Sequence, residues 1–574
     1  MPRSAGPDRG RPQALPRPPG VAQFPPLQRL GHRVRVEGGS ACRGRVLLCA
    51  VVALLFAWAA PAHAGDAHIT AEKKIGPRVI ELTISTSAFT GPTKVDVDLP
   101  VGYDADPRRR WPVTYFLAGT MNTYRTFNDF VDGVRLTESF PSIVVSPNGD
   151  SGYWSDWYNA AAFGPPMYET YVIDQLIPLI DARFRTIPRR SQRAVMGTSM
   201  GGYGAMMVAA HHPDLFVAAA SLSGAVDSNL QANGAVLSAS PTFQGAQPDA
   251  IYGPRAEQEV RWHGHNPTDL ADNLRDLDLQ VRTANGAPNP AIGENPASAD
   301  GVSCVVEQGV HMASVNLHDA LAALHIPHLW KDYGAGCHTV PNFEREIADT
   351  LQVFTKVFAQ PPPSHASFDY MSIKPAFEIW NWHIRADPKR ALEFLRLNKV
   401  SARGLTLVGS GTTSVTTPPL FRGLRRVDLD NASPATATPD AAGRIRFTAD
   451  LGAANTGQQY TPGVTTTQTS RTVTFAPHAL IEISRIHATS LSVRICARAL
   501  GGAVAAHMHV LDTDGQAATR TARLTLSSIT VCRALRWTRR PVDAKSTLLI
   551  AGEDGAGHPV SSRRTIRLRQ VRDE

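Results

Sequence analysis

Residues 194–202 of this 574-residue chain read AVMGTSMGG, and Ser199 lies at the centre of a G-x-S-x-G pattern. In a nucleophile elbow the serine occupies a strained turn between a strand and a helix, where a side chain at either flanking glycine would collide. The flanks fit this arrangement, because residues 193–196 are typical of a short buried strand and residues 203–211 are rich in helix formers. The pattern therefore predicts that Ser199 is a nucleophile. The alternative is an ordinary turn between a strand and a helix.

Strand-like and helix-like segments alternate around this pattern, from residue 68 to about residue 358. Short continuous apolar runs at 113–117 and 143–145 are typical of central parallel strands. Apolar residues recur with helical spacing in 167–184 and 343–358. The alternation predicts an α/β domain over residues 65–360, with helices around a mostly parallel sheet.

The first 64 residues have the features of an export leader. Residues 46–60 form an apolar run that follows Arg43 and Arg45 and precedes the A-x-A cleavage pattern at 62–64. A membrane-spanning helix needs about 20 apolar residues, so this run is short for an anchor. We therefore expect a signal peptide and a mature protein that is secreted or associated with the cell envelope.

The formal net charge of +8 depends largely on this leader. Residues 1–64 hold nine Arg and no Lys against Asp8 and Glu37, so the rest of the chain carries a net charge of about +1. An electrostatic case for nucleic-acid binding therefore fails. No Cys/His spacing suggests zinc, and the pair at 211–212 is typical of a helix C-terminus. We expect neither a metal nor another cofactor.

Four cysteines follow the leader, namely Cys304, Cys337, Cys496 and Cys532. An even number in an exported chain predicts disulfides. Four cysteines allow three pairings, and the domain layout favours Cys304 with Cys337 and Cys496 with Cys532.

The character of the chain changes after three consecutive prolines at 361–363. We interpret residues 361–370 as a Pro-rich linker between domains. Beyond it, short alternating runs are separated by Gly, Thr, Ser, Asn and Pro, which predicts an all-β, sandwich-like domain over residues 371–574. This region contains no group of Ser, His and acid that resembles a catalytic set.

A nucleophilic serine needs a histidine base, which is usually oriented by a carboxylate. In α/β-hydrolases these groups follow one another in the order Ser, acid, His. His338 follows the strand-like residues 329–333 and precedes the last predicted helix, where the base is expected. The other histidines of this region are less suitable, and three of them fall in a predicted helix: His311, His318, His325 and His328.

The acid is less obvious from the residues. The loop at 284–293, after the strand-like residues 279–283, contains no Asp or Glu, so the acid must come later. Glu294, Asp300 and Glu307 are the candidates, and spacing alone leaves the three open.

The oxyanion hole of this fold uses backbone N–H groups. One belongs to the residue after the nucleophile, which is Met200. The other comes from the loop after an early strand, where Thr120 follows the run at 113–117.

Four segments together carry a family resemblance: LAG at 117–119, YWSDWY at 153–158, GTSMG at 197–201 and AASLSG at 219–224. With these segments the chain resembles the antigen 85 mycolyltransferases, which belong to the wider esterase D-like family, over about residues 69–358. The resemblance implies that Glu307 is the triad acid and supports Thr120 and Met200 as oxyanion donors. It also leads us to expect Trp157 and Tyr158 at the substrate.

The chain departs from the antigen 85 pattern where trehalose is held. Ala118 and Met121 stand in place of an Asp and an Arg, and Val340 replaces the aromatic residue that follows the catalytic histidine by two. A charge-assisted hydrogen bond contributes about 1.5–3 kcal/mol. We therefore expect weak transfer or none to trehalose, with the acyl-transfer chemistry unaffected.

These observations predict an exported serine esterase or acyltransferase that uses Ser199, Glu307 and His338. Its partner would be an acyl ester, such as a cell-envelope lipid or glycan ester, and we expect a monomer. The alternative is a noncatalytic relative that binds cell wall or glycan. Reaction with a fluorophosphonate would separate the two.

Overall fold

The computed structural model describes residues 67–567, apart from 160–165, 295–300, 364–366, 423, 425, 478–479, 489–491, 501–503, 512–518, 528, 539–544 and 555–558. The predicted leader at 1–64 lies outside the described residues, as does Asp300, one of the three candidate acids.

A nine-stranded, mostly parallel sheet organises the N-terminal part of the described chain. Its strands are β1 (His68–Lys74), β2 (Val79–Ser85), β3 (Thr93–Asp98), β4 (Val113–Leu117), β5 (Ile143–Pro147), β6 (Arg193–Thr198), β7 (Ala218–Leu222), β8 (Asp278–Thr283) and β9 (Leu329–Asp332). Their order across the sheet is β1-β2-β3-β5-β4-β6-β7-β8-β9. Pairing is antiparallel from β1 to β5 and parallel from β5 onward. β4 to β7 are buried along their whole length, which explains their continuous apolar sequences.

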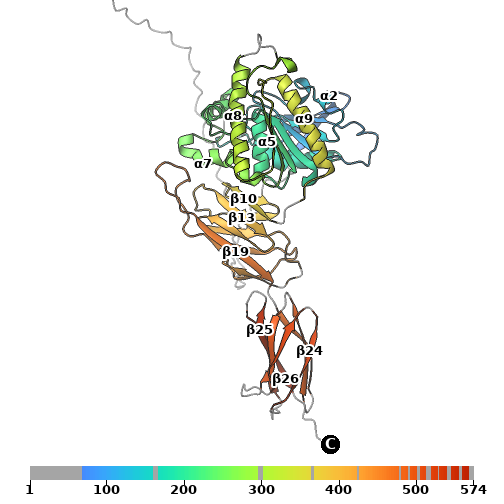
Figure 1. Ribbon diagram of the computed structural model, residues 1–574, viewed down its shortest axis with the longest axis vertical. Helices are drawn as coiled ribbons and strands as arrows, with labels where there is room; N and C mark the ends of the chain where they lie inside the picture. Colours follow the sequence, from blue (N-terminus) through green and yellow to red (C-terminus); the bar gives the residue numbers. More distant parts are fainter. Residues whose placement is uncertain are drawn as a thin grey trace, which may run out of the picture. The chain divides into compact units, whose positions relative to one another are not determined.

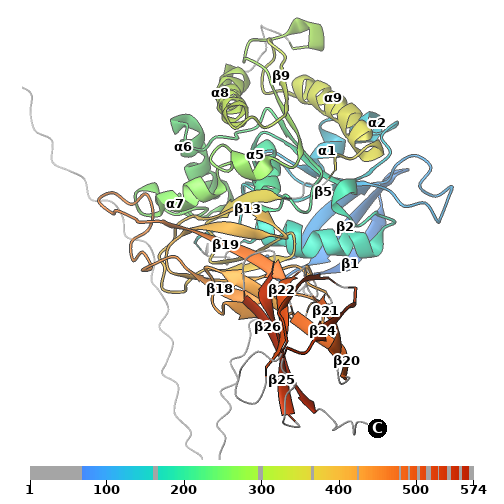
Figure 2. The ribbon, with the colours of Figure 1, turned by 60° about the horizontal axis from the view of Figure 1, so that its bottom comes forward.

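Helices cover both faces of this sheet, as Figures 1 and 2 show. They are α1 (Thr126–Asp129), α2 (Gly133–Leu136), α3 (Tyr168–Thr170), α4 (Ile177–Arg183), α5 (Met200–His211), α6 (Gln231–Ala239), α7 (Arg255–His265), α8 (Gly301–Ala323) and α9 (Val340–Ala359). A π-helical segment, η2 (Tyr171–Leu176), joins α3 to α4, and four short 3-10 turns are η3 (Arg190–Gln192), η4 (Ser240–Gln244), η5 (Ala271–Leu274) and η6 (Pro290–Ile292).

The two helical layers follow from the alternation of side chains along β6. Val195 belongs to the buried cluster that contains α5 and Leu317 of α8, whereas Met196 belongs to the cluster that contains Ile347 of α9. The strand order and the helices on both faces are those of an α/β-hydrolase. This part of the fold prediction is confirmed.

Beyond residue 367 the described residues form only antiparallel pairs of strands. The strands are β10 (Phe368–Ser372), β11 (Ala376–Ile379), β12 (Trp382–Arg385), β13 (Leu395–Ser401), β14 (Gly404–Gly409), β15 (Thr412–Thr416), β16 (Val427–Asp430), β17 (Thr436–Ala437), β18 (Arg446–Asp450), β19 (Thr469–Pro477), β20 (Leu480–Ala488), β21 (Ser492–Leu500), β22 (Val504–Leu511), β23 (Ala522–Leu526), β24 (Val531–Arg536), β25 (Lys545–Asp554) and β26 (Pro559–Arg567). β10 begins inside the residues expected to form the linker.

These strands form four sheets, in the orders β10-β13-β14-β19-β16-β17, β11-β12-β15-β18, β20-β21-β24 and β23-β22-β25-β26. One buried cluster takes Leu397 from the first sheet and Val415 from the second. Another takes Ile495 from the third sheet and Met508 from the fourth. Two sheets that share a buried layer are the arrangement of a sandwich. The strand content agrees with the predicted all-β region. Most of its buried residues fall into these two groups, whereas Met371, Ile373 and Phe394 belong to the main buried cluster of the α/β region.

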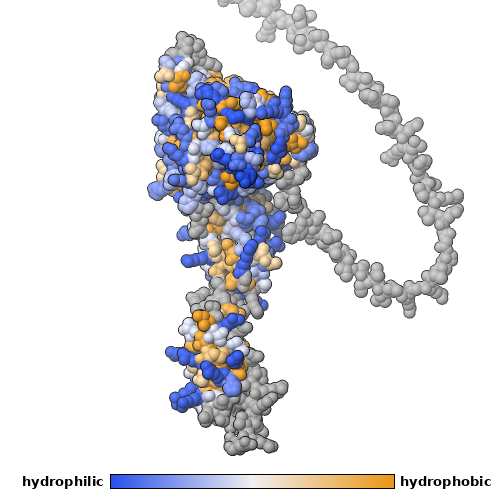
Figure 3. Space-filling model, turned by 90° about the vertical axis from the view of Figure 1, so that its right-hand side faces the viewer, coloured by the Kyte–Doolittle hydropathy of each residue, from blue (hydrophilic) through white to orange (hydrophobic). Residues whose placement is uncertain are grey.

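The surface of the described residues mixes hydrophilic and hydrophobic side chains, as the face in Figure 3 shows. Large apolar side chains exposed in the α/β region include Met121, Phe130, Val302 and Val305. Such exposure is common, because apolar atoms contribute much of any protein surface. In the part of the chain that the structure describes, no helix has both the length and the apolar character needed to cross a membrane.

Candidate active site

Ser199 lies on a sharp turn between β6 and α5. Its φ of 59° and ψ of −123° fall in a region that non-glycine residues rarely occupy. A Cβ at Gly197 would overlap the backbone of Gly201, and one at Gly201 would overlap the carbonyl oxygen of Leu117. Both glycines are therefore required by close backbone approach. The geometry is that of a nucleophile elbow.

His338 lies in the loop between β9 and α9, and its side chain is 12% exposed. Its Nδ1 is 2.8 Å from Glu307 Oε2. Its backbone N–H donates to the carbonyl of Ser303, which ties the histidine loop to the start of α8. His338 Nε2 is buried and has no hydrogen-bond partner among the described residues. The imidazole is thus oriented through one nitrogen and presents the other.

Glu307 lies on α8 and is fully buried. Its Oε1 accepts the backbone N–H of Ala284 at 2.8 Å and the hydroxyls of Ser223 at 2.6 Å and Thr283 at 3.3 Å. Three donors on one oxygen, with His338 on the other, satisfy a buried carboxylate. Glu307 can therefore hold Nδ1–H of His338 and stabilise an imidazolium.

Glu294, another candidate acid, is also buried, but it bonds residues of the neighbouring loops rather than the imidazole of His338. It accepts the backbone N–H groups of Cys337 and Asn289 and the hydroxyl of Thr339. No hydrogen bond to His338 is among these contacts.

The rival histidines do not meet a buried acid. His318 and His328 contact each other, and His311 lies 4.0 Å from the partly exposed Asp332. His325 follows the end of α8 rather than lying within it.

Both favoured cysteine pairings occur as disulfides, Cys304 with Cys337 and Cys496 with Cys532. Cys304 lies one helical turn before Glu307 on α8, and Cys337 directly precedes His338. The first disulfide therefore joins the segment that carries the acid to the loop that carries the histidine.

The predicted oxyanion donors, the N–H groups of Thr120 and Met200, belong to segments next to Ser199. Met200 is the first residue of α5, where N–H groups lack partners within the helix. The segment before Thr120 lies against the serine, since a Cβ at Gly119 would be 3.2 Å from Ser199 Cβ. Met121 has a positive φ of 60° and donates its N–H to Ser151 Oγ.

Trp157 and Tyr158, expected at the substrate, have different environments. Trp157 is 5% exposed, belongs to the main buried cluster and donates its indole N–H to the carbonyl of Gly152. Tyr158 is 40% exposed, and the guanidinium of Arg261 lies 4.7 Å from its ring centroid. Trp157 is thus part of the core, and the predicted contacts of Trp157 and Tyr158 with substrate stay predictions.

Sequence reasoning did not single out Ser223 or Glu346. Ser223 Oγ lies 2.6 Å from Glu307 Oε1 and 3.0 Å from Glu346 Oε1, so it stands between two buried carboxyl groups. A signal was present in α9, where Asn342, Glu346 and Thr350 recur every four residues and are all fully buried. A polar stripe on the buried face of a helix is unusual and calls for partners.

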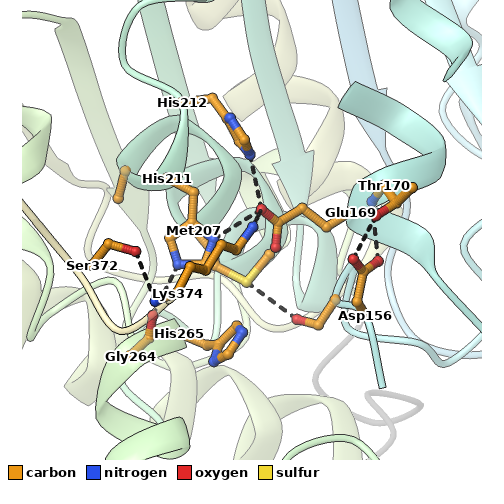
Figure 4. Close-up of polar contacts among 12 residues, drawn as sticks. Asp156, Glu169, Thr170, Met207, His211, His212, Gly264, His265, Ser372 and Lys374 are labelled. Atoms are coloured by element: carbon orange, nitrogen blue, oxygen red, sulfur yellow. Dashed lines mark hydrogen bonds and ion pairs between the residues drawn. The ribbon is translucent and has the colours of Figure 1, made fainter. Parts of the chain in front are cut away.

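A second buried carboxylate of the α/β region also meets histidines. Glu169, on α3, contacts His211 at 3.1 Å, His212 at 2.8 Å and Lys374 at 2.7 Å, as Figure 4 shows. We call these four residues the Glu169 cluster. The other ring nitrogen of His211 is 2.9 Å from the carbonyl of Gly264. No group of three or more His, Cys, Asp or Glu within the described ranges is arranged to hold a metal ion.

Comparisons with known proteins show which families the chain is similar to. Residues 86–348 match the family model described as Putative esterase. An esterase of Mycobacterium tuberculosis is 35% identical over 222 residues, 38% of this chain and 47% of its own length. The diacylglycerol acyltransferase/mycolyltransferase Ag85B of Mycobacterium leprae is 30% identical over 190 residues, 31% of this chain and 54% of its own length.

The MPT51/MPB51 antigen of Mycobacterium tuberculosis is 34% identical over 153 residues, 26% of this chain and 49% of its own length. A solved S-formylglutathione hydrolase from Agrobacterium tumefaciens is 16% identical, with a TM-score of 0.40 over 51% of this chain and 99% of that one. The chain spans about half the length of the three mycobacterial relatives it matches. The predicted resemblance is confirmed: residues 86–348 match the Putative esterase model, and part of the chain is similar to an antigen 85 mycolyltransferase.

Proposed function

We propose that the chain is a serine esterase or acyltransferase that acts on carboxylic esters through an acyl-enzyme. One observation carries the proposal. A serine on a strained, glycine-flanked elbow occurs in the same domain as a His338–Glu307 pair at 2.8 Å, in the chain order of an α/β-hydrolase. The similarity to an esterase and to an acyltransferase/mycolyltransferase supports the same chemistry.

In the proposed reaction Ser199 Oγ attacks the ester carbonyl while His338 Nε2 accepts the hydroxyl proton. Glu307 keeps Nδ1–H of the imidazole in place and stabilises the positive charge that forms. The backbone N–H groups of Thr120 and Met200 would bind the negative oxygen of the tetrahedral intermediate.

Collapse of that intermediate breaks the ester bond. The alcohol leaves with the proton from His338, and the acyl group stays on Ser199 as a new ester. Water or a hydroxyl acceptor then attacks the acyl-enzyme, with His338 again as the base. The products are a carboxylic acid or a new ester.

We propose short- to medium-chain esters as the substrates of the isolated protein, with weak transfer or none to trehalose. Ala118, Met121 and Val340 lack the charged and aromatic side chains expected for trehalose. A screen of acyl donors and acceptors with product identification tests this substrate range. Efficient formation of trehalose dimycolate would contradict it.

We further propose that the protein is exported and acts on a cell-envelope lipid or glycan ester. The two disulfides and the leader predicted at residues 1–64 support export. Detection of the protein outside the cytoplasm, cleaved after about residue 64, would test this step.

The experiment for the activity is hydrolysis of p-nitrophenyl esters by the wild type, Ser199→Ala and His338→Ala. We expect each substitution to reduce kcat by about 10⁴-fold or more, with circular dichroism and thermal unfolding unchanged. A folded Ser199→Ala protein with full activity would rule out the mechanism.

A further inference from the structure

Glu346 is a fully buried carboxyl group that the proposed reaction does not use directly. Its Oε1 lies 3.0 Å from Ser223 Oγ, which lies 2.6 Å from Oε1 of Glu307. Ser223 comes from the loop after β7, Glu307 from α8 and Glu346 from α9. One hydroxyl therefore joins the proposed triad acid to a second carboxyl group on another helix.

Only one hydroxyl hydrogen is available for the two contacts of Ser223 with Glu307 and Glu346. Ser223 has one hydroxyl hydrogen and can donate to one carboxyl group at a time. Glu307 already accepts the backbone N–H of Ala284 on the same oxygen, and a backbone N–H can only donate. Because Glu307 also holds Nδ1–H of His338 as a carboxylate, we take it as the acceptor of the Ser223 hydrogen. The 3.0 Å contact between Ser223 and Glu346 then needs a proton on Glu346.

Asn342 completes the arrangement around Ser223. Its Nδ2 lies 3.3 Å from Ser223 Oγ, and its Oδ1 accepts Nε–H of Arg345 at 2.8 Å. Because the guanidinium can only donate, Arg345 fixes the orientation of the amide. Ser223 Oγ then accepts from Asn342 and Glu346 and donates to Glu307, which uses its full hydrogen-bonding capacity.

We propose that Glu346 is a positioning residue: as a neutral acid it donates to Ser223, so that Ser223 donates to Glu307 and holds that carboxylate against His338. This inference rests on the proposed function, since it assigns a role to Glu346 through the Ser199–His338–Glu307 reaction. Glu346 does not touch the reacting atoms.

The electrostatics agree with a neutral Glu346. Burial, and then the negative charge of Glu307, raise the pKa of Glu346 well above its usual range. The contact with Ser223 and the cations Arg345 and Arg282 act to lower this pKa. Once ionised at high pH, Glu346 could no longer donate and would repel Glu307. Activity should therefore fall as pH rises through this pKa.

The experiment compares Glu346→Gln with Glu346→Leu. The Gln amide can still donate to Ser223 but cannot ionise, whereas Leu fills the site without a donor. We expect Glu346→Gln to keep near-wild-type kcat at neutral pH and to lose the alkaline decline. We expect Glu346→Leu to lower kcat by about 10- to 100-fold with KM little changed, the range expected for one hydrogen bond to a charged group.

Ser223→Ala is the second variant, because Glu346→Leu could fail to fold. It removes the linking hydroxyl and should lower kcat in the same range. Equal losses in Glu346→Gln and Glu346→Leu, or no loss in both Glu346→Leu and Ser223→Ala, would overturn the proposal.

A readout independent of turnover separates this proposal from the proposed function. The proton of His338 on Nδ1 should give a downfield NMR signal in the wild type and Glu346→Gln that is shifted or lost in Ser223→Ala. If the wild type shows this signal pattern but hydrolyses no ester, the proposed function fails and the hydrogen-bond arrangement stands. An unchanged signal in Ser223→Ala would overturn the arrangement whatever the activity.

Discussion

Two buried glutamates of the α/β region each contact a histidine, and their surroundings differ in one decisive respect. His338 binds Glu307 through Nδ1, while its Nε2 has no partner among the described residues. His211 binds Glu169 through Nδ1 and the carbonyl of Gly264 through Nε2. A histidine can accept a proton from a nucleophile only through a nitrogen that is not already engaged. The contacts of the second nitrogen, rather than the Glu–His contact, therefore separate a candidate base from a structural histidine.

The charges around the two glutamates also differ. Glu307 is surrounded by hydroxyl and N–H donors, with no Lys or Arg in hydrogen-bonding contact among the described residues. Although burial acts to raise the pKa of Glu169, the Lys374 ammonium and the contact with His211 lower it well below its usual range. Lys374 follows β10, so the Glu169 cluster joins α3 and α5 to the segment after that strand. We therefore expect Glu307 to affect rate and Glu169 to affect stability.

The largest expected effect is that of Glu307→Gln. It removes the charge that stabilises the imidazolium and places an amide against Nδ1–H of His338. We expect kcat/KM for p-nitrophenyl esters to fall about 10³- to 10⁴-fold, as for other triads that lose their carboxylate.

Glu294→Gln is the matched control for Glu307→Gln, because Glu294 is buried in the same region but bonds the histidine loop rather than the imidazole. We expect a much smaller loss of rate. If Glu294→Gln were the crippled variant and Glu307→Gln were active, the acid would be wrongly assigned.

The next effect is that of the Cys304–Cys337 disulfide. Its sequence separation of 33 corresponds to a stabilisation of about 3–4 kcal/mol in the chain-entropy model. Because it joins the segments of Glu307 and His338, Cys304→Ser/Cys337→Ser should lower both the free energy of unfolding and kcat. Mild reduction of the wild type should lower activity before the domain unfolds.

Cys496→Ser/Cys532→Ser is a control of similar loop length, with a sequence separation of 36. It should lower stability without lowering kcat. If the two double substitutions had equal effects on kcat, the Cys304–Cys337 disulfide would have only a stabilising role.

A smaller effect, on stability alone, is expected of Glu169→Gln. The substitution removes the buried carboxylate that accepts from the two histidines and from Lys374, whose side chain is 40% exposed. We expect a loss of about 1–3 kcal/mol in the free energy of unfolding. Since the pKa of Glu169 is lowered in the folded state, this stabilisation is present above the usual value of 4.5 and is lost as pH falls through the lower folded value. Chemical denaturation at neutral and acid pH measures it.

Glu72→Gln is the control for Glu169→Gln. It breaks a pair with Arg183 in which both side chains are about a third or more exposed. We expect a loss of roughly 0.5 kcal/mol. A large fall of kcat in Glu169→Gln, at a pH where the variant is folded, would contradict the purely structural role of Glu169.

Local signals predicted much of this molecule. The glycines of the elbow indicate a tight backbone turn, and the apolar runs at 113–117 and 143–145 indicate buried strands. Both properties depend on residues close together in the sequence. The helix predicted at 167–184 is present, although a π-helical segment interrupts it. His338 could be predicted because its place follows from the order of strands and helices. The choice of Glu307 needed the family resemblance, since spacing alone left three acids open.

Contacts between distant elements could not be predicted in the same way. The contacts of Ser223 with Glu307 and Glu346 join a loop and two helices that are far apart in the sequence. No short sequence motif indicates such contacts. The pair at 211–212 was correctly placed at a helix end, yet its contact with Glu169 spans more than 40 residues. In the C-terminal region the alternating runs indicated strands, but strand pairing decides which apolar faces share a core.

Labelling of the intact, folded protein with a fluorophosphonate, followed by peptide mapping, tests directly whether Ser199 is the nucleophile. We expect a single adduct on Ser199 that is absent from Ser199→Ala and forms much more slowly in His338→Ala. We also expect normal labelling of Glu169→Gln, because the Glu169 cluster takes no part in the proposed reaction. No adduct on the folded wild type, or an adduct on another serine that persists in Ser199→Ala, would contradict it.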